Sequence, residues 1–266
     1  MQEEIYIRIL NCKLVEIDDQ WNYPNMLCTY WRLYINSSDG AILETDNKRH
    51  YLKKNTLYII PAWQKVGLYN NLKIEHFYVH FDLIGVTGFL CKKTFPSLME
   101  FGNIDRKEII SIIEQNYKDP LNKFIIDTRL KSLIYGLLFE YFKKISNEKR
   151  ILLDRLIPAT GKYSSLFEFI DNNLNGSIDN DSLARLSGKS PSHFLRDFTD
   201  SVGITPAKFV TQRRIARSIE MLILTDDTID KIAYDTGFTD RFHFSKTFKK
   251  ITGMPPAAYR KHSEGI

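Results

Sequence analysis

An internal repeat in the C-terminal hundred residues constrains the fold more than any other feature of the chain. The segment SPSHFLRDFTDSVGITPAKF, starting at Ser190, aligns at an offset of 50 residues with DRFHFSKTFKKITGMPPAAY, starting at Asp240. The matched positions include Phe194 and Phe244, Phe198 and Phe248, Gly203 and Gly253, and Pro206 and Pro256. Upstream, Leu183-Ala184 and Gly188 match Ile232-Ala233 and Gly237 at an offset of 49. Each copy predicts a short helix, a glycine turn and a second helix, which is the pattern of a helix-turn-helix.

Capping residues place the ends of these helices. Asp181 can cap a short SLARLSG helix, and Ser190-Pro191 and Thr205-Pro206 each combine an N-cap with proline at the first helical position. The helix between the copies, from Pro206 to about Leu224, would be about 28 Å long. One turn of DNA is about 34 Å, so a helix of this length can hold two recognition helices in successive major grooves.

The distribution of charged residues along the chain supports DNA binding more strongly than the net charge does. The net charge is +5, a mild excess that by itself does not identify a nucleic-acid-binding protein. Acidic residues gather in the first helix of each copy, and basic residues in the second helix and after it. Residues 241–262 contain no acid and the bases Arg241, Lys246, Lys249, Lys250, Arg260 and Lys261. Matched basic runs in matched motifs lie where phosphates would lie.

The first hundred residues are typical of short strands. From Lys73 to Leu83, one face carries Phe77, Val79, Phe81 and Leu83, and the other carries His76, Tyr78, His80 and Asp82. This alternation predicts a strand with one face in the core and the other partly solvated. Thr56 to Ile60 predicts a second strand, and Ser38-Asp39-Gly40 and Asp46-Asn47 predict turns. Many short strands favour a sandwich or small barrel.

From about Asn103 the apolar spacing becomes helical. It predicts helices from Asp105 to Lys118 and from Asp127 to Ile145. The second has a broad apolar stripe of Leu130, Leu133, Ile134, Leu137, Leu138, Tyr141, Phe142 and Ile145. Such a stripe is either part of a core or a dimer face, and spacing does not separate the two.

Composition limits the cellular compartment and the kinds of cofactor site that we expect. Cys12, Cys28 and Cys91 are too widely spaced for a CxxC pair, and no HxH or HExxH is present, so no metal or other cofactor is expected. The N-terminus MQEEIYIRIL is acidic where a signal peptide is basic, and no run approaches the roughly 20 apolar residues of a membrane span. We therefore expect a cytoplasmic protein with no membrane association.

The segment IDKIAYDTGFTDRFHFSKTFKKITGMPPAAYRK, from Ile229 to Lys261, resembles the signature of the AraC/XylS family of bacterial transcription regulators. The resemblance extends from about Tyr163 to His262. It implies an α+β protein in three parts. Residues 1–102 would form a cupin-like β-sandwich or barrel that binds an effector, and residues 103–157 a helical dimerisation and linker segment. Residues 160–266 would form an all-α DNA-binding domain with two helix-turn-helix motifs joined by a long helix.

Carried over by position, the resemblance assigns DNA contacts to Ser192, Leu195, Arg196, Arg241, Phe242 and Lys246. Arg196 and Arg241 are the strongest candidates for base reading, because a guanidinium can contact guanine O6 and N7 together. Leu195 and Phe242 are apolar where relatives usually carry polar groups, so they either contact thymine methyls or extend the core. Lys249 and Lys250 are expected to contact phosphate.

In the N-terminal half, LYIIPAW from Leu57 to Trp63 and HFYVHF from His76 to Phe81 are similar to two recognisable strands of the family. The resemblance places His76 and Tyr78, with His80, at an effector site. The arginine that sugar-binding members place in this pocket has no evident counterpart, so a sugar is only one candidate for the effector.

The leading hypothesis is a non-enzymatic, sequence-specific regulator that senses a small molecule, and the sequence does not separate an activator from a repressor. Its expected partners are promoter DNA, RNA polymerase and a second copy of the chain. Three alternatives stay open: a cupin-type metalloenzyme, a DNA-repair alkyl-transfer regulator, and a non-specific nucleoid-associated protein. The first lacks a GxHxH-type cluster at His50, His76 and His80, and the second lacks clustered cysteines.

Overall fold

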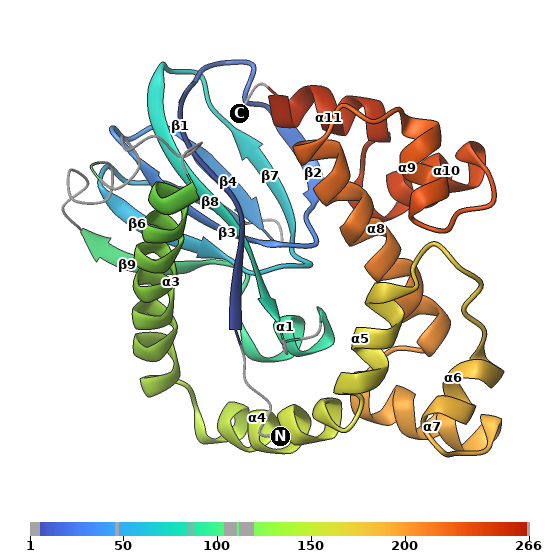
Figure 1. Cartoon of the computed structure of the whole chain (residues 1–266). Coiled ribbons are helices and arrows are strands. Elements are labelled where there is room, and N and C mark those ends of the chain that lie inside the picture. Colours follow the sequence, from blue (N-terminus) through green and yellow to red (C-terminus); the bar gives the residue numbers. More distant parts are fainter. Residues whose placement is uncertain are drawn as a thin grey trace. The chain divides into compact units, whose positions relative to one another are not determined.

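The computed structural model describes residues 6–45, 48–84, 86, 88–103, 111 and 120–264. The chain divides into two compact units (Figure 1). The N-terminal unit contains Tyr6–Ile84 and Cys91–Arg150, and the C-terminal unit contains Ile151–Gly265 with Gly85–Leu90. Each unit is described separately below.

The described strands of the N-terminal unit form a two-sheet β-sandwich. They are β1 (Tyr6–Ile17), β2 (Tyr23–Leu27), β3 (Trp31–Asn36), β4 (Ile42–Thr45), β5 (Lys48–Tyr51), β6 (Thr56–Ile60), β7 (Lys65–Tyr69), β8 (Ile74–Ile84) and β9 (Met99–Asn103). One sheet has the order β1-β8-β3-β6-β9 and the other β2-β7-β4-β5, with antiparallel neighbours throughout. A β-rich unit followed by an all-helical one confirms the predicted α+β class. The Ser38-Asp39-Gly40 turn lies between β3 and β4, whereas Asp46-Asn47 lies outside the described residues.

Strand β8 corrects the expectation of one solvated face. Phe77, Val79 and Phe81 are fully buried, as predicted, but His76 and Tyr78 are also only 1 % exposed. Both faces of the central strands are covered. On one face Trp31 and Phe81 stack, and Phe95 bridges Trp31 to Tyr141 of the following helical segment. The opposite face is enclosed within the unit, so alternation in β8 separates two buried surfaces rather than core from solvent.

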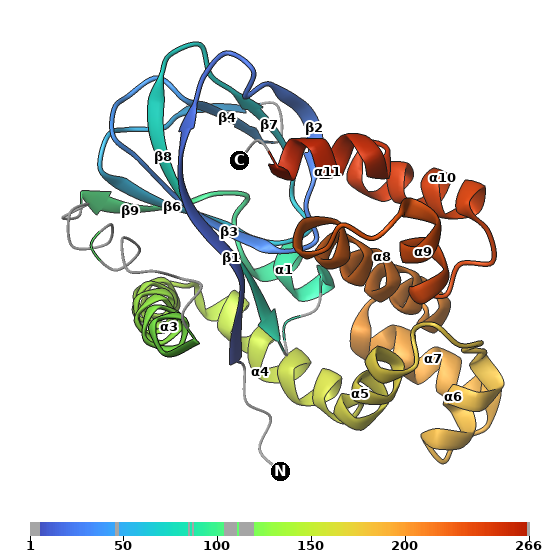
Figure 2. The same cartoon turned by 45° about the horizontal axis from the view of Figure 1, so that its top comes forward.

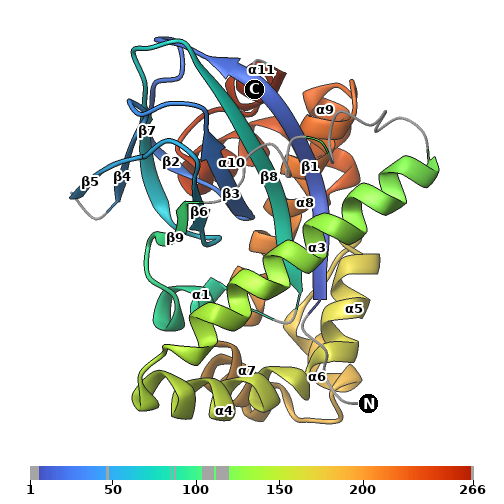
Figure 3. The same cartoon turned by 90° about the vertical axis from the view of Figure 1, so that its left-hand side faces the viewer.

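Helix α1 (Gly88–Thr94) precedes β9, and helix α3 (Pro120–Lys143) runs across the five-stranded sheet (Figure 3). Leu130, Ile134 and Leu138 of α3 are buried, so the predicted stripe belongs to the core. The Ile7 amide donates a hydrogen bond of 3.1 Å to the Tyr135 hydroxyl, which ties α3 to β1. The helix begins at Pro120 rather than Asp127. Apart from Ser111, the helix predicted from Asp105 to Lys118 lies outside the described residues.

The C-terminal unit is helical. After α4 (Asn147–Gly161) come α5 (Ser164–Asn172), α6 (Asn180–Leu186), α7 (Pro191–Val202), α8 (Pro206–Leu224), α9 (Ile229–Asp235), α10 (Arg241–Thr252) and α11 (Pro256–Glu264). Helix α8 has the predicted bounds, and Figure 2 shows it running between the two groups of shorter helices. The cap of α6 is Asp179, which accepts from the Ser182 amide, so the prediction of Asp181 was two residues late.

The repeat has a clear structural basis. Gly188 and Gly237 have φ values of 65° and 81° in the turns within the motifs, and Gly203 and Gly253 have φ values of 81° and 91° at the ends of α7 and α10. This left-handed region favours glycine, so the matched glycines mark turns that other residues adopt at a cost. Thus α6-turn-α7 and α9-turn-α10 are two copies of one unit, as the sequence predicts.

Candidate nucleic-acid interface and effector site

Helices α7 and α10 each bury one side and expose the other. Phe194 and Phe198 of α7 and Phe244 and Phe248 of α10 are fully buried, which confirms their predicted place in the core. The predicted DNA-contacting residues all lie on exposed positions of these helices: Ser192, Leu195, Arg196, Arg241, Phe242, Lys246, Lys249 and Lys250. Each helix therefore exposes a largely polar surface over an aromatic anchor, with several bases on α10 and Arg196 on α7.

The two apolar members of this set do not extend the core. Phe242, in the first turn of α10, is 86 % exposed, and Leu195, in the middle of α7, is 39 % exposed. An aromatic ring held this far into solvent gains nothing from the core. Both side chains therefore lie at the surface of their helices rather than in the core.

Arg241 is held by the first helix of its own motif. Its guanidinium donates to the Asp230 carboxylate of α9 at 3.1 Å, and both side chains are more than half exposed. A solvent-exposed pair of this kind contributes little to stability. The ion pair instead holds the Arg241 side chain in place, because it links α9 to the N-terminal turn of α10.

Helix α7 is anchored by its own acidic residue. The Asp197 carboxylate accepts from Lys162 Nζ at 2.7 Å, from the Tyr163 hydroxyl at 2.7 Å and from Lys189 Nζ. These donors hold the pKa of Asp197 well below its usual range, with the lysine hydrogen bonds as the main cause. The cluster joins α7 to the start of α5 and to the turn before α7, and it keeps a negative charge on the recognition helix neutralised.

The predicted effector residues line the buried face of the five-stranded sheet that is turned away from α3. In the register of β3 and β8, Asn36 is opposite His76, Tyr34 is opposite Tyr78, and Arg32 is opposite His80. The rings form a continuous series: Tyr34 to His76 at 4.6 Å, Tyr78 to His80 at 4.5 Å, and Tyr30 to His80 at 4.6 Å between centroids. The structure thus brings His76, Tyr78 and His80 together in the interior of the sandwich.

Sequence reasoning missed Arg32. Its side chain is fully buried on β3, beside the same aromatic series, and interacts with the Tyr34 hydroxyl. The available signal was the strand WRLYIN, in which Arg32, Tyr34 and Asn36 alternate with apolar residues between buried strands. No arginine in this part of the chain was assigned to the site from sequence, and the structure adds one: the buried Arg32 lies opposite His80 in the register of β3 and β8.

Burial dominates the electrostatics of this interior. It lowers the pKa of His76 to about 3, and it raises the pKa of Tyr34 to about 12 although Arg32 opposes the shift. His76 Nδ1 donates to the Asn36 side-chain oxygen at 2.7 Å, so the neutral ring is oriented by its strand neighbour. The site is therefore a neutral histidine and tyrosine surface next to one cationic group.

Two observations concern other site classes. Among the described residues, no group of three His, Cys, Asp or Glu side chains is arranged to hold a metal ion. Of the helices that the structure describes, none is both long enough and apolar enough to cross a membrane.

The repeated segment matches a known domain model. Residues 183–262 match the model of a helix-turn-helix domain. The uncharacterized HTH-type transcriptional regulator YbfP of Bacillus subtilis (strain 168) is 37 % identical over 92 residues, which are 35 % of this chain and 31 % of YbfP. The raffinose operon transcriptional regulatory protein RafR of Pediococcus pentosaceus is 22 % identical over 242 residues, which are 89 % of this chain and 86 % of RafR. The chain thus spans most of RafR but less than a third of YbfP.

The whole fold also has a counterpart among solved structures. Unsaturated fatty acid bound wild-type ToxT from Vibrio cholerae strain SCE256 superposes with a TM-score of 0.61 at 15 % identity, over 100 % of this chain and 99 % of ToxT. This likeness shows a shared fold, with a β-sheet unit before a helical one. The C-terminal unit therefore carries a helix-turn-helix domain of the AraC type, the kind of domain found in transcriptional regulators.

Proposed function

We propose that this regulator reads a promoter with α7 and α10 in successive major grooves, under the control of a small molecule bound in the N-terminal sandwich. The observation that carries the proposal is the duplicated unit: two recognition helices, each anchored by two buried phenylalanines, of which α7 exposes Arg196 and α10 exposes several bases. Arg196, Arg241 and Lys246 would contact base edges, Ser192, Leu195 and Phe242 would complete the readout, and Lys249 and Lys250 would contact phosphate.

For the effector site, we propose the interior surface of His76, Tyr78 and His80, with Arg32 and Tyr34 added by the structure. Aromatic faces bind flat apolar surfaces, while histidine and guanidinium groups supply hydrogen bonds that fix orientation. The names of RafR and ToxT refer to a raffinose operon and to a bound unsaturated fatty acid, so similar folds serve different ligands. A sugar is our first candidate, because its ring and hydroxyls match this mixed lining.

We propose further that the protein acts as a homodimer in the cytoplasm and activates transcription through contact with RNA polymerase. Support for the dimer comes from α3. Opposite its buried stripe, the helix exposes Leu121 at 67 %, Phe124 at 68 % and Phe139 at 62 %. At 3.6 residues per turn these side chains fall on one face, and an exposed apolar stripe of this kind is typical of an interaction surface.

Selection of bound sequences from a random DNA pool by the full chain tests the proposed function. We expect two conserved half-sites about 10 base pairs apart, and binding that weakens steeply with salt because lysine and arginine contacts release counterions. Enrichment of no common sequence, with equal affinity for all duplexes, would reject sequence-specific regulation and favour a non-specific DNA-binding protein.

A further inference from the structure

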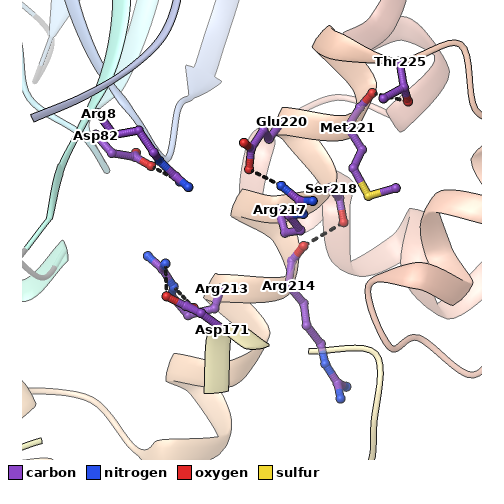
Figure 4. Close-up of polar contacts among 10 residues, drawn as sticks. All are labelled: Arg8, Asp82, Asp171, Arg213, Arg214, Arg217, Ser218, Glu220, Met221 and Thr225. Atoms are coloured by element: carbon purple, nitrogen blue, oxygen red, sulfur yellow. Dashed lines mark hydrogen bonds and ion pairs between the residues drawn. The ribbon is translucent and has the colours of Figure 1, made fainter. Parts of the chain in front are cut away.

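In the C-terminal unit, the turn of the second motif packs next to α8 against the segment that joins α5 to α6. Leu174 of this segment belongs to the same hydrophobic cluster as Phe194 and Phe198 of α7. Arg214 projects from α8 toward the segment after α5, on a different side of the helix from Arg213 (Figure 4). Its Nε donates to the Leu174 carbonyl at 3.0 Å and its Nη2 donates to the Gly176 carbonyl at 2.7 Å. Both carbonyls belong to the turn that follows α5, beyond its last helical residue Asn172, and the guanidinium supplies each with a hydrogen-bond donor.

The second motif reaches the same two groups from the other side. Gly237, in the turn between α9 and α10, has no side chain, and a Cβ placed there would lie 2.0 Å from the Leu174 carbonyl oxygen and 2.8 Å from the Arg214 guanidinium carbon. The turn backbone therefore packs directly against the Arg214–Leu174 contact. In the first motif, by contrast, a Cβ at the matching Gly188 would meet nothing within 4 Å.

The other polar contacts of α8 described here each involve at most one further element. Arg213 forms a two-point ion pair with Asp171 of α5, at 2.6 and 2.5 Å. The buried Ser218 hydroxyl donates to Thr236, at the end of α9, at 3.1 Å. Arg217 pairs with Glu220 on its own helix at 2.8 Å and links no second element. Arg214 and Gly237 thus mark the place where the linking helix and the turn of the second motif both contact the segment before α6, and this segment is connected to α7 through the cluster of Leu174.

From this geometry we propose that Arg214 is a positioning residue that fixes α7 relative to α10 and so sets the spacing of half-sites that the protein accepts. The inference rests on the proposed reading of DNA by both motifs. The 19-residue helix α8 spans about 28 Å, and stiffness of the helix alone does not fix the angle of the motifs at its two ends. The half-buried guanidinium fixes that angle, because it fills the junction and satisfies two carbonyls at once.

The test uses the full chain and the site obtained by selection, together with versions in which one base pair is added or removed between the half-sites, and a version with one half-site scrambled. We expect the wild-type protein to lose at least about tenfold in affinity for each spacing variant, within the range that one mismatched base pair costs. Arg214→Met keeps the stem and removes both donors. We expect it to bind all three spacings within about threefold of one another, and to bind the scrambled site as the wild type does.

The matched control is Arg217→Met, which removes the same charge from the same helix but breaks only a contact within α8. We expect it to keep the wild-type spacing preference. A second pair, Gly237→Ala and Gly188→Ala, replaces glycines of similar positive φ, so local backbone strain is shared and only Gly237→Ala obstructs the junction. We expect relaxed spacing for Gly237→Ala alone, with thermal unfolding confirming that each variant is folded.

An Arg214→Met protein that keeps the full spacing preference would overturn the proposal. Equal losses of affinity on the intact and scrambled sites would also overturn it, because they would indicate damage to a single motif. Failure of the proposed function is separately visible, since the wild-type protein would then select no two-part site.

Discussion

At the residue scale, position along each recognition helix distinguishes the residues that we propose to read bases from those that we propose to contact phosphate. Arg196 lies midway between the buried Phe194 and Phe198, so it projects away from the core, and Lys246 has the same relation to Phe244 and Phe248. Arg241 lies in the first turn of α10, the part of a recognition helix that usually enters the groove deepest. Lys249 and Lys250 lie in the last turn, farther from that point.

We therefore expect Arg196→Ala and Arg241→Ala each to cost about 1–3 kcal/mol on the selected site and to relax the preference at one base pair. Lys249→Ala should weaken binding to all sequences alike and reduce the salt slope by about one unit. Titrations on the selected site and on its single-base variants measure both effects. If the arginine variants lose affinity equally on every sequence, Arg196 and Arg241 contact phosphate and do not read bases.

Because His76 is buried, we expect the stability of the N-terminal unit to depend on pH. Burial lowers the pKa of His76 to about 3, against about 6.5 in an unfolded chain, so the unfolded chain binds the proton more tightly. The contribution of His76 to the free energy of unfolding is therefore present above pH 6.5 and is lost as the pH falls below it. The expected loss is about 2 kcal/mol between pH 7 and pH 5. All tryptophans, Trp21, Trp31 and Trp63, lie in the N-terminal unit, so urea unfolding followed by their fluorescence reports this unit.

The control for this prediction is His76→Gln, which cannot take up a proton and retains an amide that can donate to Asn36. We expect the loss of stability between pH 7 and pH 5 to be much smaller in this variant. An unchanged loss would assign the pH dependence to another buried group, of which the neighbouring His80 is the first to examine.

At the scale of elements, sequence predicted helices better than it predicted the surroundings of strands. The bounds of α7 and α8 followed from local chemistry, because a cap followed by proline fixes a helix start whatever packs against it. The cap of α6 was misplaced because Asp179 and Asp181 are both suitable residues, and only the backbone at Asp179 is extended.

The strands depended on contacts that are distant in the sequence. Alternation in β8 was visible, but what covers each face depends on β3 and on the helical segment that contains Tyr141. The burial of Arg32 was missed for the same reason: the alternation of its strand was visible, but charge normally indicates an exposed position. For α3, the start at Asp127 excluded Leu121 and Phe124, so the exposed stripe was missed while the buried one was taken as a possible dimer face.

At the scale of the whole molecule, two reading helices on one chain leave unanswered how a sensing unit could influence DNA binding. Pairing of two chains gives one answer. When two DNA-binding units are joined, binding of the first raises the effective concentration of the second, and the overall affinity can exceed that of either unit by roughly 10²–10⁴-fold. Any ligand that favours one arrangement of the pair then changes promoter occupancy in proportion to its differential affinity for that arrangement.

The exposed face of α3 is the place where we expect this pairing. Phe124 and Leu121 near its start and Phe139 near its end are each more than 60 % exposed, and burial of such side chains against a second copy would contribute about 1.5–3 kcal/mol apiece. Phe124→Glu places a charge in that contact. We expect sedimentation of the full chain at micromolar concentration to show a dimer for the wild type and a monomer for Phe124→Glu. Tyr51→Glu, at a 67 % exposed site on β5, is the matched control and should stay dimeric. A wild-type monomer, or a Phe124→Glu dimer, would remove α3 as the dimer face and leave the two motifs of one chain to account for operator affinity.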